Sequence, residues 1–429
     1  MSNVVNIFRS GLCTGCGTCV GVCPQSALRM CINEKIGVYQ PKLAQEKCNS
    51  CGICYRVCPG YSSNVAKLNA VLFEKKSQDS SIGYYEKCHI GKSRDPQIMR
   101  DSSSGGLVTS LLIHALEEEI IDGALITKFN SKKPLEPEPF IARSKEEIIS
   151  ASYSKYCPVP LSSGLSQINK QDGKFAVVGL PCHIHGIRKA ESINNNLKKK
   201  IVLHFGLFCS HAPSFLATNQ LLWTIGIRKE SILKIDYRGN GWPGGMTIML
   251  KNGKKIFVPH NSPSYWGNIF GNYFYPFRCT LCDDSTAEFS DLSFGDPWHI
   301  SPKNSKLSLL IVRNKIGDDL VRSATSMKKI ELSLSNPKKI IQSQKGALSF
   351  KKDLIRERLF LAKLVGKKVP LYSSSSSTRR INIQNLVSSF TFYTRISLTS
   401  RENMFYNSLI RGYLTSRTRT SCKSFEDLK

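Results

Sequence analysis

The sequence predicts an α+β protein in which a small cysteine-rich unit precedes a larger α/β unit. A motif of four cysteines occurs twice before residue 60, so the start of the chain is an internal repeat. Between residues 107 and 224, short apolar runs typical of buried strands alternate with helical patterns, as they do in parallel sheets. A polar stretch at residues 75–82 separates the two units.

The N-terminal unit, residues 1–70, contains two runs of four cysteines with the same spacing. In each run three cysteines stand at three-residue intervals, and a fourth follows with proline directly after it. This spacing is typical of bacterial ferredoxins, in which three thiolates bind one [4Fe–4S] cluster and the fourth binds the other. We therefore expect two clusters. One would be held by Cys13, Cys16, Cys19 and Cys58, and the other by Cys48, Cys51, Cys54 and Cys23.

Two other uses of cysteine fit this pattern less well. A disulfide framework is typical of short secreted chains, whereas this chain has 429 residues and begins without the apolar core of a signal peptide. Zinc sites use pairs of ligands, not two runs of four that each end in Cys-Pro. Since no apolar stretch is long enough to span a bilayer, we expect a cytoplasmic protein in a reducing environment.

The formal net charge of +28 raises the question of an anionic partner. Nucleic-acid binding is the simplest interpretation, but the basic residues are scattered and no nucleic-acid motif occurs, so we expect no specific nucleic acid. Acidic redox partners would be attracted to such a surface. Peripheral contact with an anionic membrane is an alternative. We favour acidic protein partners.

The larger unit, residues 83–365, opens with a serine- and glycine-rich loop, Asp101–Gly106 (DSSSGG), ahead of an amphipathic helix expected over 107–118. Free N–H groups at a helix N-terminus attract anions, and phosphate is the usual ligand. Serine is also simply a good helix cap. The loop by itself therefore leaves phosphate binding open.

Two strand–turn–helix patterns follow, at residues 175–189 and 200–224. Cys182 and Cys209 fall at the ends of these two strands, where α/β proteins usually bind ligands. Cys279 and Cys282 form a C-x2-C pair further along. Spacing alone does not decide between a third cluster, a zinc site and four unrelated thiols. Residues 234–258 should form antiparallel strands with a hairpin turn at Asn252-Gly253.

Seven motifs of the larger unit together resemble the β-subunit family of coenzyme F420 hydrogenases and dehydrogenases. The resemblance covers roughly residues 1–365, and the basic, serine-rich tail at 370–429 lies outside it. The motifs are DSSSGG (101–106), SKY (154–156), VGLPCHIHGIRK (178–189), LFCSHAPS (207–214), RCTLCDD (278–284), DLSFGDPW (291–298) and QSQKGALSFKK (342–352).

This resemblance implies that residues 83–365 bind FAD and a third [4Fe–4S] cluster. Carried over by motif, the residues that hold the FAD phosphates would be Ser103, Ser104, Gly105 and Gly106, with Lys155 nearby. The ligands of the third cluster would be Cys182, Cys209, Cys279 and Cys282. The full fold prediction is then α+β, with an N-terminal bacterial-ferredoxin-like domain followed by an α/β flavin-binding domain.

The implied function is that of an oxidoreductase in which FAD links the clusters to a hydride donor or acceptor, either coenzyme F420 or a related substrate. An electron-transfer protein or a partner redox subunit would exchange electrons with the clusters. We name no catalytic acid or base. The alternatives are a non-catalytic electron-transfer subunit of a larger complex and a reductase of a small organic substrate in a polysaccharide-related pathway.

Overall fold

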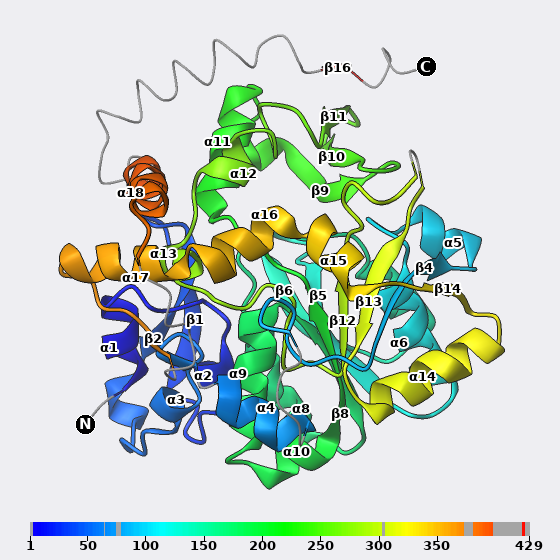
Figure 1. Ribbon diagram of the computed structural model, residues 1–429, viewed down its shortest axis with the longest axis horizontal. Coiled ribbons are helices and arrows are strands. Elements are labelled where there is room, and N and C mark those ends of the chain that lie inside the picture. The colour runs from blue at the N-terminus through cyan, green and yellow to red at the C-terminus, as the bar shows by residue number, and fades with distance from the viewer. Residues whose placement is uncertain are drawn as a thin grey trace.

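The computed structural model describes residues 3–63, 65–73, 79–302, 305–372, 381–397 and 423–424. Its N-terminal module, residues 3–63, is drawn in dark blue in Figure 1. A short antiparallel hairpin joins the two cysteine loops. The elements are α1 (Val4–Arg9), α2 (Thr18–Gly21), β1 (Leu28–Asn33), β2 (Val38–Leu43), η1 (Gln45–Lys47), α3 (Ile53–Arg56) and β3 (Ser62–Ser63), followed by α4 (Val65–Phe73).

The larger unit is built on an eight-stranded mixed sheet with the order β14-β4-β13-β12-β8-β7-β5-β6. Its middle strands β12, β8, β7 and β5 run parallel, as the strand–helix alternation predicts, and the outer pairs are antiparallel. The strands are β4 (Lys87–Ser93), β5 (Gly123–Phe129), β6 (Pro137–Ala142), β7 (Phe175–Gly179), β8 (Ile201–Leu207), β12 (Leu292–Gly295), β13 (Ser308–Val312) and β14 (Ile330–Leu334).

Helices cover both faces of this sheet, because its strands carry buried apolar side chains on both sides. One face packs against α5 (Pro96–Arg100), α6 (Leu107–Glu117), α7 (Lys145–Ser150) and α14 (Lys315–Ser326). The other packs against η2 (Leu161–Gly164), α8 (Leu165–Lys170), α9 (Pro181–Glu191), α10 (Asn195–Lys200), α15 (Pro337–Ser343) and α16 (Lys345–Leu348).

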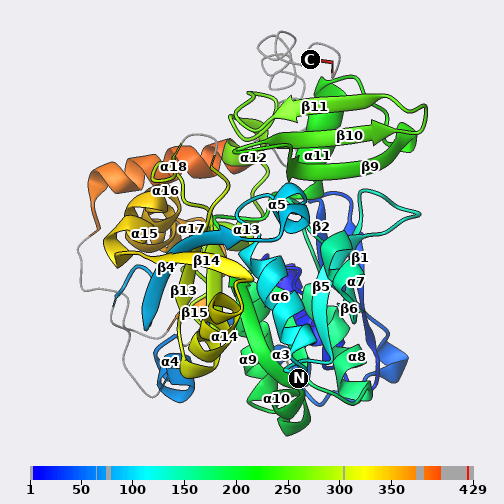
Figure 2. The ribbon, with the colours of Figure 1, turned by 90° about the vertical axis from the view of Figure 1, so that its right-hand side faces the viewer.

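A second, smaller sheet stands above the first in Figure 2 and has its own core. The predicted antiparallel strands are confirmed, and the β10–β11 hairpin turns at Asn252-Gly253, where Gly253 has a φ of 86°. The aromatic stretch around Tyr265 and Phe270 packs beneath it. The elements are α11 (Phe215–Thr224), η3 (Lys229–Ser231), β9 (Ile232–Gly239), β10 (Gly245–Leu250), β11 (Lys255–Pro259), α12 (Ile269–Asn272) and β16 (Lys423–Ser424).

The N-terminal module packs tightly against the larger unit. The Ser162 backbone N–H donates to the Cys16 carbonyl at 2.9 Å. A Cβ on Gly186 of α9 would collide with Thr18 of α2, so glycine is needed for this close approach. Of the linker expected at 75–82, only residues 79–82 lie within the described part of the chain. The cysteine loops therefore lie directly on the sheet's helical layer.

Part of the expected basic tail also packs against the molecule. Strand β15 (Leu371–Tyr372) pairs with β3 of the N-terminal module, and α18 (Ile383–Ser397) packs against α17 (Ile355–Leu364). The chain reaches α17 through η4 (Ser349–Asp353). The rest of the tail, 373–380, 398–422 and 425–429, lies outside the described residues. Across the described residues, we find no helix with the length and apolarity needed to cross a bilayer.

Candidate functional site

Four cysteines gather where the start of α2 meets the residues after α3, and we call them the first group: Cys13, Cys16, Cys19 and Cys58. Burial raises the pKa of Cys19 well above its ordinary value, and the nearby thiols of Cys13, Cys16 and Cys58 raise it further. Burial, followed by the charge of Cys16, raises the pKa of Cys58 to about 11. Because these thiols interact electrostatically, they are close neighbours. They are the same four that the spacing assigns to one cluster.

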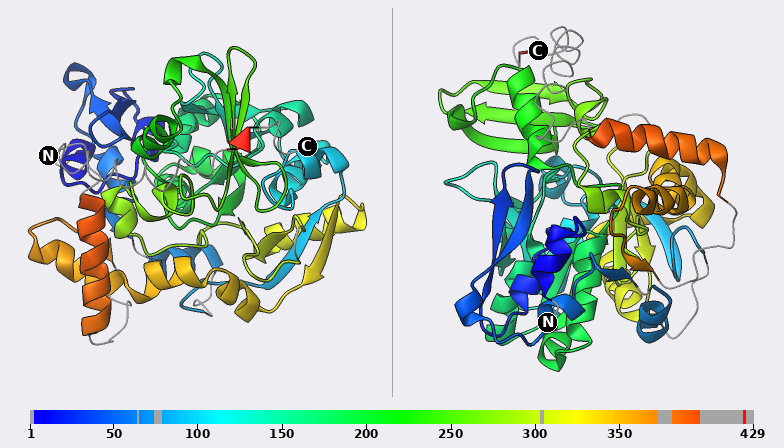
Figure 3. Two further views of the ribbon diagram at one scale, coloured as in Figure 1. Left: turned by 90° about the horizontal axis from the view of Figure 1, so that it is seen from above. Right: turned by 90° about the vertical axis from the view of Figure 1, so that its left-hand side faces the viewer.

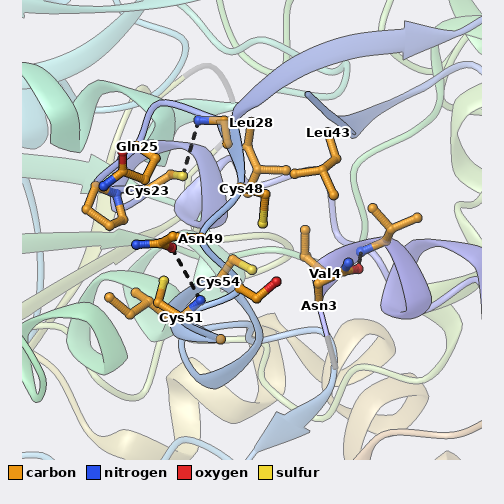
Figure 4. Close-up of a pocket in the computed structure, with 16 residues that line it drawn as sticks. Asn3, Val4, Cys23, Gln25, Leu28, Leu43, Cys48, Asn49, Cys51 and Cys54 are labelled. Atoms are coloured by element: carbon orange, nitrogen blue, oxygen red, sulfur yellow. Dashed lines mark hydrogen bonds between the residues drawn. The ribbon is translucent and has the colours of Figure 1, made fainter. Parts of the chain in front are cut away.

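The second group consists of Cys23, Cys48, Cys51 and Cys54. All four line one pocket with about 540 Å³ of empty space, together with Val4, Leu28 and Leu43, and Figure 4 shows these side chains around it. Burial raises the pKa of Cys54, and the charges of Cys51 and Cys23 act in the same direction. The fourth cysteine of each run thus lies with the three cysteines of the other run. Cys51 is exposed, so this group lies at the surface.

The third group, Cys182, Cys209, Cys279 and Cys282, lines a larger pocket with about 810 Å³ of empty space. Cys182 lies in the first turn of α9 after β7, and Cys209 follows β8, so the parallel sheet brings them to one edge. The C-x2-C pair is carried there by α13 (Phe277–Thr280). Burial raises the pKa of Cys209 to about 12. Residues from distant parts of the sequence therefore converge here.

The three groups form a row. Cys54 of the second group contributes to the raised pKa of Cys19 in the first group, after burial and the thiols of its own group. Cys16 of the first group is likewise the largest contributor, after burial, to the raised pKa of Cys182 in the third. The first group thus lies between the other two. The row runs from the exposed Cys51 to the edge of the main sheet.

Buried cations surround the thiols of the first and third groups. Lys351 is 2% exposed, and its ammonium donates to the Asp284 carbonyl at 2.6 Å and to Cys282 Sγ at 3.3 Å. The Arg278 guanidinium donates to the carbonyls of Pro59, Gly60 and Leu281. Lys189 Nζ donates to the Cys58 carbonyl at 2.9 Å. Such charges stabilise thiolates or an anionic group bound between them.

Sequence reasoning did not identify these cations, although all three lie in motifs of the family resemblance. Lys189 ends one motif, Lys351 is the second-last residue of another, and Arg278 begins a third. The available signal was position: Arg278 immediately precedes a cysteine pair. A lysine in a chain with so many lysines gives no sign of its own burial.

The serine- and glycine-rich loop precedes α6, as expected, but its side chains are engaged within the protein. Ser103 Oγ donates to the Arg238 carbonyl and accepts from the Ser154 N–H, both at 2.9 Å. Ser104 Oγ donates to the Leu307 carbonyl at 2.5 Å. Gly105 and Gly106 have no room for a Cβ because neighbouring protein atoms surround them. What the loop leaves for an anion is the N-terminus of α6, which has no side-chain cap.

Lys155 follows Ser154, whose backbone N–H contacts this loop, but the Lys155 ammonium is engaged elsewhere. Its ammonium donates to three carbonyls of its own segment, those of Ala151, Ser152 and Tyr153, at 2.5, 2.9 and 3.0 Å. Burial lowers its pKa to about 8. The structure therefore does not bring the Lys155 ammonium together with the Ser103–Gly106 loop, as the motif had led us to expect.

Arg238 is a residue that sequence reasoning missed. Its backbone contacts Ser103, its side chain is 1% exposed, and its Nη1 lies 2.5 Å from Asp296. The Trp242 and Trp298 rings lie 4.8 and 5.1 Å from the guanidinium carbon. Its Nη2 is buried and has no hydrogen-bond partner among the described residues. A buried donor of this kind suits an anionic group such as a phosphate.

Family models match most of the chain. The model described as the N-terminal part of the coenzyme F420 hydrogenase/dehydrogenase β subunit matches residues 88–166, and the model of its C terminus matches residues 172–338. A 4Fe-4S dicluster domain model matches residues 12–61, which include both N-terminal cysteine runs.

Similar proteins come from methanogenic archaea. An uncharacterised protein of Methanocaldococcus jannaschii is 27% identical over 74% of this chain and 88% of its own length. The coenzyme F420 hydrogenase β subunit of Methanosarcina barkeri is 26% identical over 66% of this chain and 91% of its own length. A coenzyme F420-dependent sulfite reductase of M. jannaschii is 29% identical over 82% of this chain, which spans only 52% of that protein.

A solved structure shares the fold. A chain of the F420-reducing [NiFe] hydrogenase complex from Methanosarcina barkeri superposes with a TM-score of 0.54 at 22% sequence identity. The match covers 68% of this chain and 97% of that chain. The fold of about two thirds of this chain is thus a known architecture.

Proposed function

Because the chain belongs to the family of coenzyme F420 hydrogenase and dehydrogenase β subunits, we propose that it is an iron–sulfur flavoprotein that moves electrons between [4Fe–4S] clusters and a hydride donor or acceptor. The family predicted from seven sequence motifs is confirmed, as is the N-terminal 4Fe–4S domain. The observation that carries the proposal is the row of three cysteine groups: Cys23 and Cys54 pack against the apolar cluster that contains Cys19 and Cys58, and Thr14 and Pro59 line the pocket of the third group. A row of closely spaced redox sites is what electron transfer over several nanometres needs.

The third group supports a third cluster through its chemistry. Four thiols line one pocket without converging on a single point: among the described residues, no three His, Cys, Asp or Glu side chains are arranged to share one metal ion. A cubane is larger than one ion and needs its four thiolates further apart. Lys351 and Arg278 supply buried positive charge beside these thiols. In the proposal, they offset the negative charge of a four-thiolate cluster.

FAD is the cofactor that would connect hydride chemistry to single-electron carriers. In this proposal the N-terminus of α6 and the free Nη2 of Arg238 bind its phosphates. Ser103 would act indirectly, because its hydroxyl joins the loop to Arg238 and to Ser154. Lys155 would hold the shape of its own segment and not contact the phosphates.

The second group is the natural entrance for electrons from outside. Cys51 is exposed, whereas Cys16, Cys19 and Cys58 of the first group are buried. An electron-transfer protein or a partner redox subunit would therefore dock at the second group. Relatives named as β subunits of F420 hydrogenase and of formate dehydrogenase support a partner subunit.

A second candidate function is a relay subunit without hydride chemistry of its own. The surface position of the second group favours it, since a pure relay also needs an exposed site. The two functions differ in whether the protein binds a flavin. A relay would contain clusters only, whereas the proposed oxidoreductase contains FAD as well.

The test is a flavin titration of the anaerobically reconstituted protein. We expect the oxidised flavin band to bleach within one turnover when reduced coenzyme F420 is added, and to bleach with NADPH at a rate at least about tenfold lower. The variant Arg238→Met should lose bound FAD, whereas Arg322→Met, an exposed arginine on α14, should retain it. Protein that contains iron but no flavin would support the relay function instead.

A further inference from the structure

Helix α18 presents an apolar stripe to solvent. Ile383, Val387 and Phe390 are 78%, 60% and 59% exposed, and their spacing of four and three residues aligns them on one side of the helix. Phe392 and Tyr393 point the other way: Phe392 lies 4.9 Å from the Phe350 ring, and Tyr393 donates to the Arg358 carbonyl. The inner face therefore fixes the helix, and the stripe must face outward.

A second apolar projection lies at the end of α17, the helix against which α18 packs. Leu364 and Val365 are 70% and 67% exposed. Three exposed lysines, Lys363, Lys367 and Lys368, flank them in the same turn. Figure 3 shows α17 and α18 crossing at the outer edge of the molecule. We call Leu364, Val365, Ile383, Val387 and Phe390 the C-terminal apolar surface.

The C-terminal part of the sequence is strongly basic. From residue 363 to the C-terminus, Lys and Arg outnumber Asp and Glu by twelve to three, and no acidic residue occurs between 358 and 401. The formal charge of the whole chain is +28. An anionic partner is therefore strongly favoured at this end of the molecule.

The shape of the surface separates a bilayer from an acidic protein. Protein interfaces are usually centred on aromatic or arginine side chains that fill pockets on the partner. Here the apolar groups are protruding side chains on a helix and a tight turn, with lysines beside them. Protruding apolar groups ringed by cations are what interfacial helices insert between anionic headgroups.

We propose that the C-terminal apolar surface docks the protein on an anionic lipid bilayer as a peripheral contact. The apolar side chains would enter the headgroup region, and the lysines would pair with lipid phosphates. On the inner face of the same helix, Tyr393 contacts Thr280, which lies between Cys279 and Cys282, so the docked helix adjoins the third group. This inference does not depend on the flavin or on the identity of the hydride partner.

The test is cosedimentation of the full-length, cluster-loaded protein with vesicles. We expect at least about tenfold tighter binding to vesicles with about 30% phosphatidylglycerol in phosphatidylcholine than to phosphatidylcholine alone. The triple variant Ile383→Ser, Val387→Ser, Phe390→Ser should lose at least about tenfold of that binding. A matched control, Leu233→Ser with Leu334→Ser, removes two equally exposed apolar groups elsewhere and should bind as wild type.

The double variant Lys367→Glu, Lys368→Glu provides an independent check, because it leaves the apolar core and α18 untouched. It should abolish the preference for phosphatidylglycerol. The proposal fails if wild type does not distinguish the two vesicle types, or if the triple variant binds as well as wild type. It also fails if the triple variant instead changes the oligomeric state in solution, since the stripe would then be an interface between copies of this chain.

Discussion

The cysteines of the N-terminal module and those of the third group reach their sites by different routes. The first two groups come from one continuous segment, residues 13–58, with a repeated spacing. The third group comes from three elements, α9, the end of β8 and α13, spread over a hundred residues. In the first case the loops themselves dictate the geometry. In the second case the order of the strands in the sheet dictates it.

The electrostatic surroundings differ in the same way. The second group is open to water at Cys51, so solvent moderates its charges. The cysteines of the third group are half-buried, and Lys351, itself buried, lies within hydrogen-bonding distance of one of their sulfurs. A buried cation stabilises an anionic neighbour far more than an exposed one does. We therefore expect clusters in the two regions to have different reduction potentials.

The largest effect should come from removing a ligand of the third group. In Cys182→Ser we expect about eight irons per chain in place of about twelve, with the N-terminal clusters unchanged. Iron analysis and electron paramagnetic resonance of the reduced protein measure both quantities. The variant Cys51→Ser should instead alter only the second group. A loss of all iron in Cys182→Ser would mean that the two regions do not assemble independently.

Substitution of Arg278, which connects the N-terminal module to the segment of the third group, should have the next largest effect. Arg278 is 4% exposed and donates to carbonyls of both regions. Arg278→Leu removes the donor to the Gly60 and Pro59 carbonyls, so we expect a loss of about 3–5 kcal/mol in the free energy of unfolding. Thermal unfolding under anaerobic conditions measures it. Arg322→Ala, on an exposed ion pair, should leave the free energy of unfolding almost unchanged, and equal losses in the two variants would contradict the assignment.

Lys351 should control the potential of the third cluster. Reduction adds negative charge, which the buried ammonium favours, so Lys351→Met should shift that potential by on the order of 100 mV in the negative direction. A potentiometric titration followed by electron paramagnetic resonance measures it. Lys189→Met should shift the first group instead, because Lys189 contacts Cys58. If both variants shift the same cluster, the proposed separation is wrong.

The smallest effect concerns pH and a network behind the third group. His204 lies between Glu191 at 2.6 Å and Asp291 at 3.0 Å. Burial opposes the charged imidazole, and so does Arg188, but the two carboxylates outweigh them and the pKa of His204 is raised. Burial also opposes charge on Glu191, but His204 and Arg188 outweigh it and the pKa of Glu191 is lowered.

The two shifts act on stability at opposite ends of the pH scale. The contribution of His204 is complete below its ordinary pKa, about 6.5, and is lost as the pH rises through the higher folded value. The contribution of Glu191 is complete above about pH 4.5 and is lost at lower pH. As the pH rises above the folded pKa of His204, we expect the free energy of unfolding to fall by about 1–2 kcal/mol. Melting temperatures measured from pH 5.5 to 8.5 should depend less on pH in His204→Gln than in wild type. In His299→Gln they should keep the wild-type pH dependence.

The same comparison explains what the sequence could and could not reveal. The spacing of Cys13 to Cys58 specifies two groups of four because its loops are local, and the strand–helix alternation specifies the parallel centre of the sheet. The convergence of Cys209 with Cys279 depends on how distant elements pack, which no spacing records. Arg238 and Lys351 were invisible for the same reason: burial of a cation is a property of the folded chain. For Lys155, the motif fixes the position of the residue in the chain but not the direction of its side chain, which bonds within its own segment.

The central claim is that three thiol groups in a row carry three clusters next to a flavin. Quantification of iron and flavin in the anaerobically reconstituted wild-type protein, with Mössbauer spectra to identify the iron species, tests it most directly. The account predicts about twelve irons, all in [4Fe–4S] clusters, and one FAD per chain. About eight irons would contradict the presence of a third cluster, and a protein without flavin would contradict the proposed oxidoreductase.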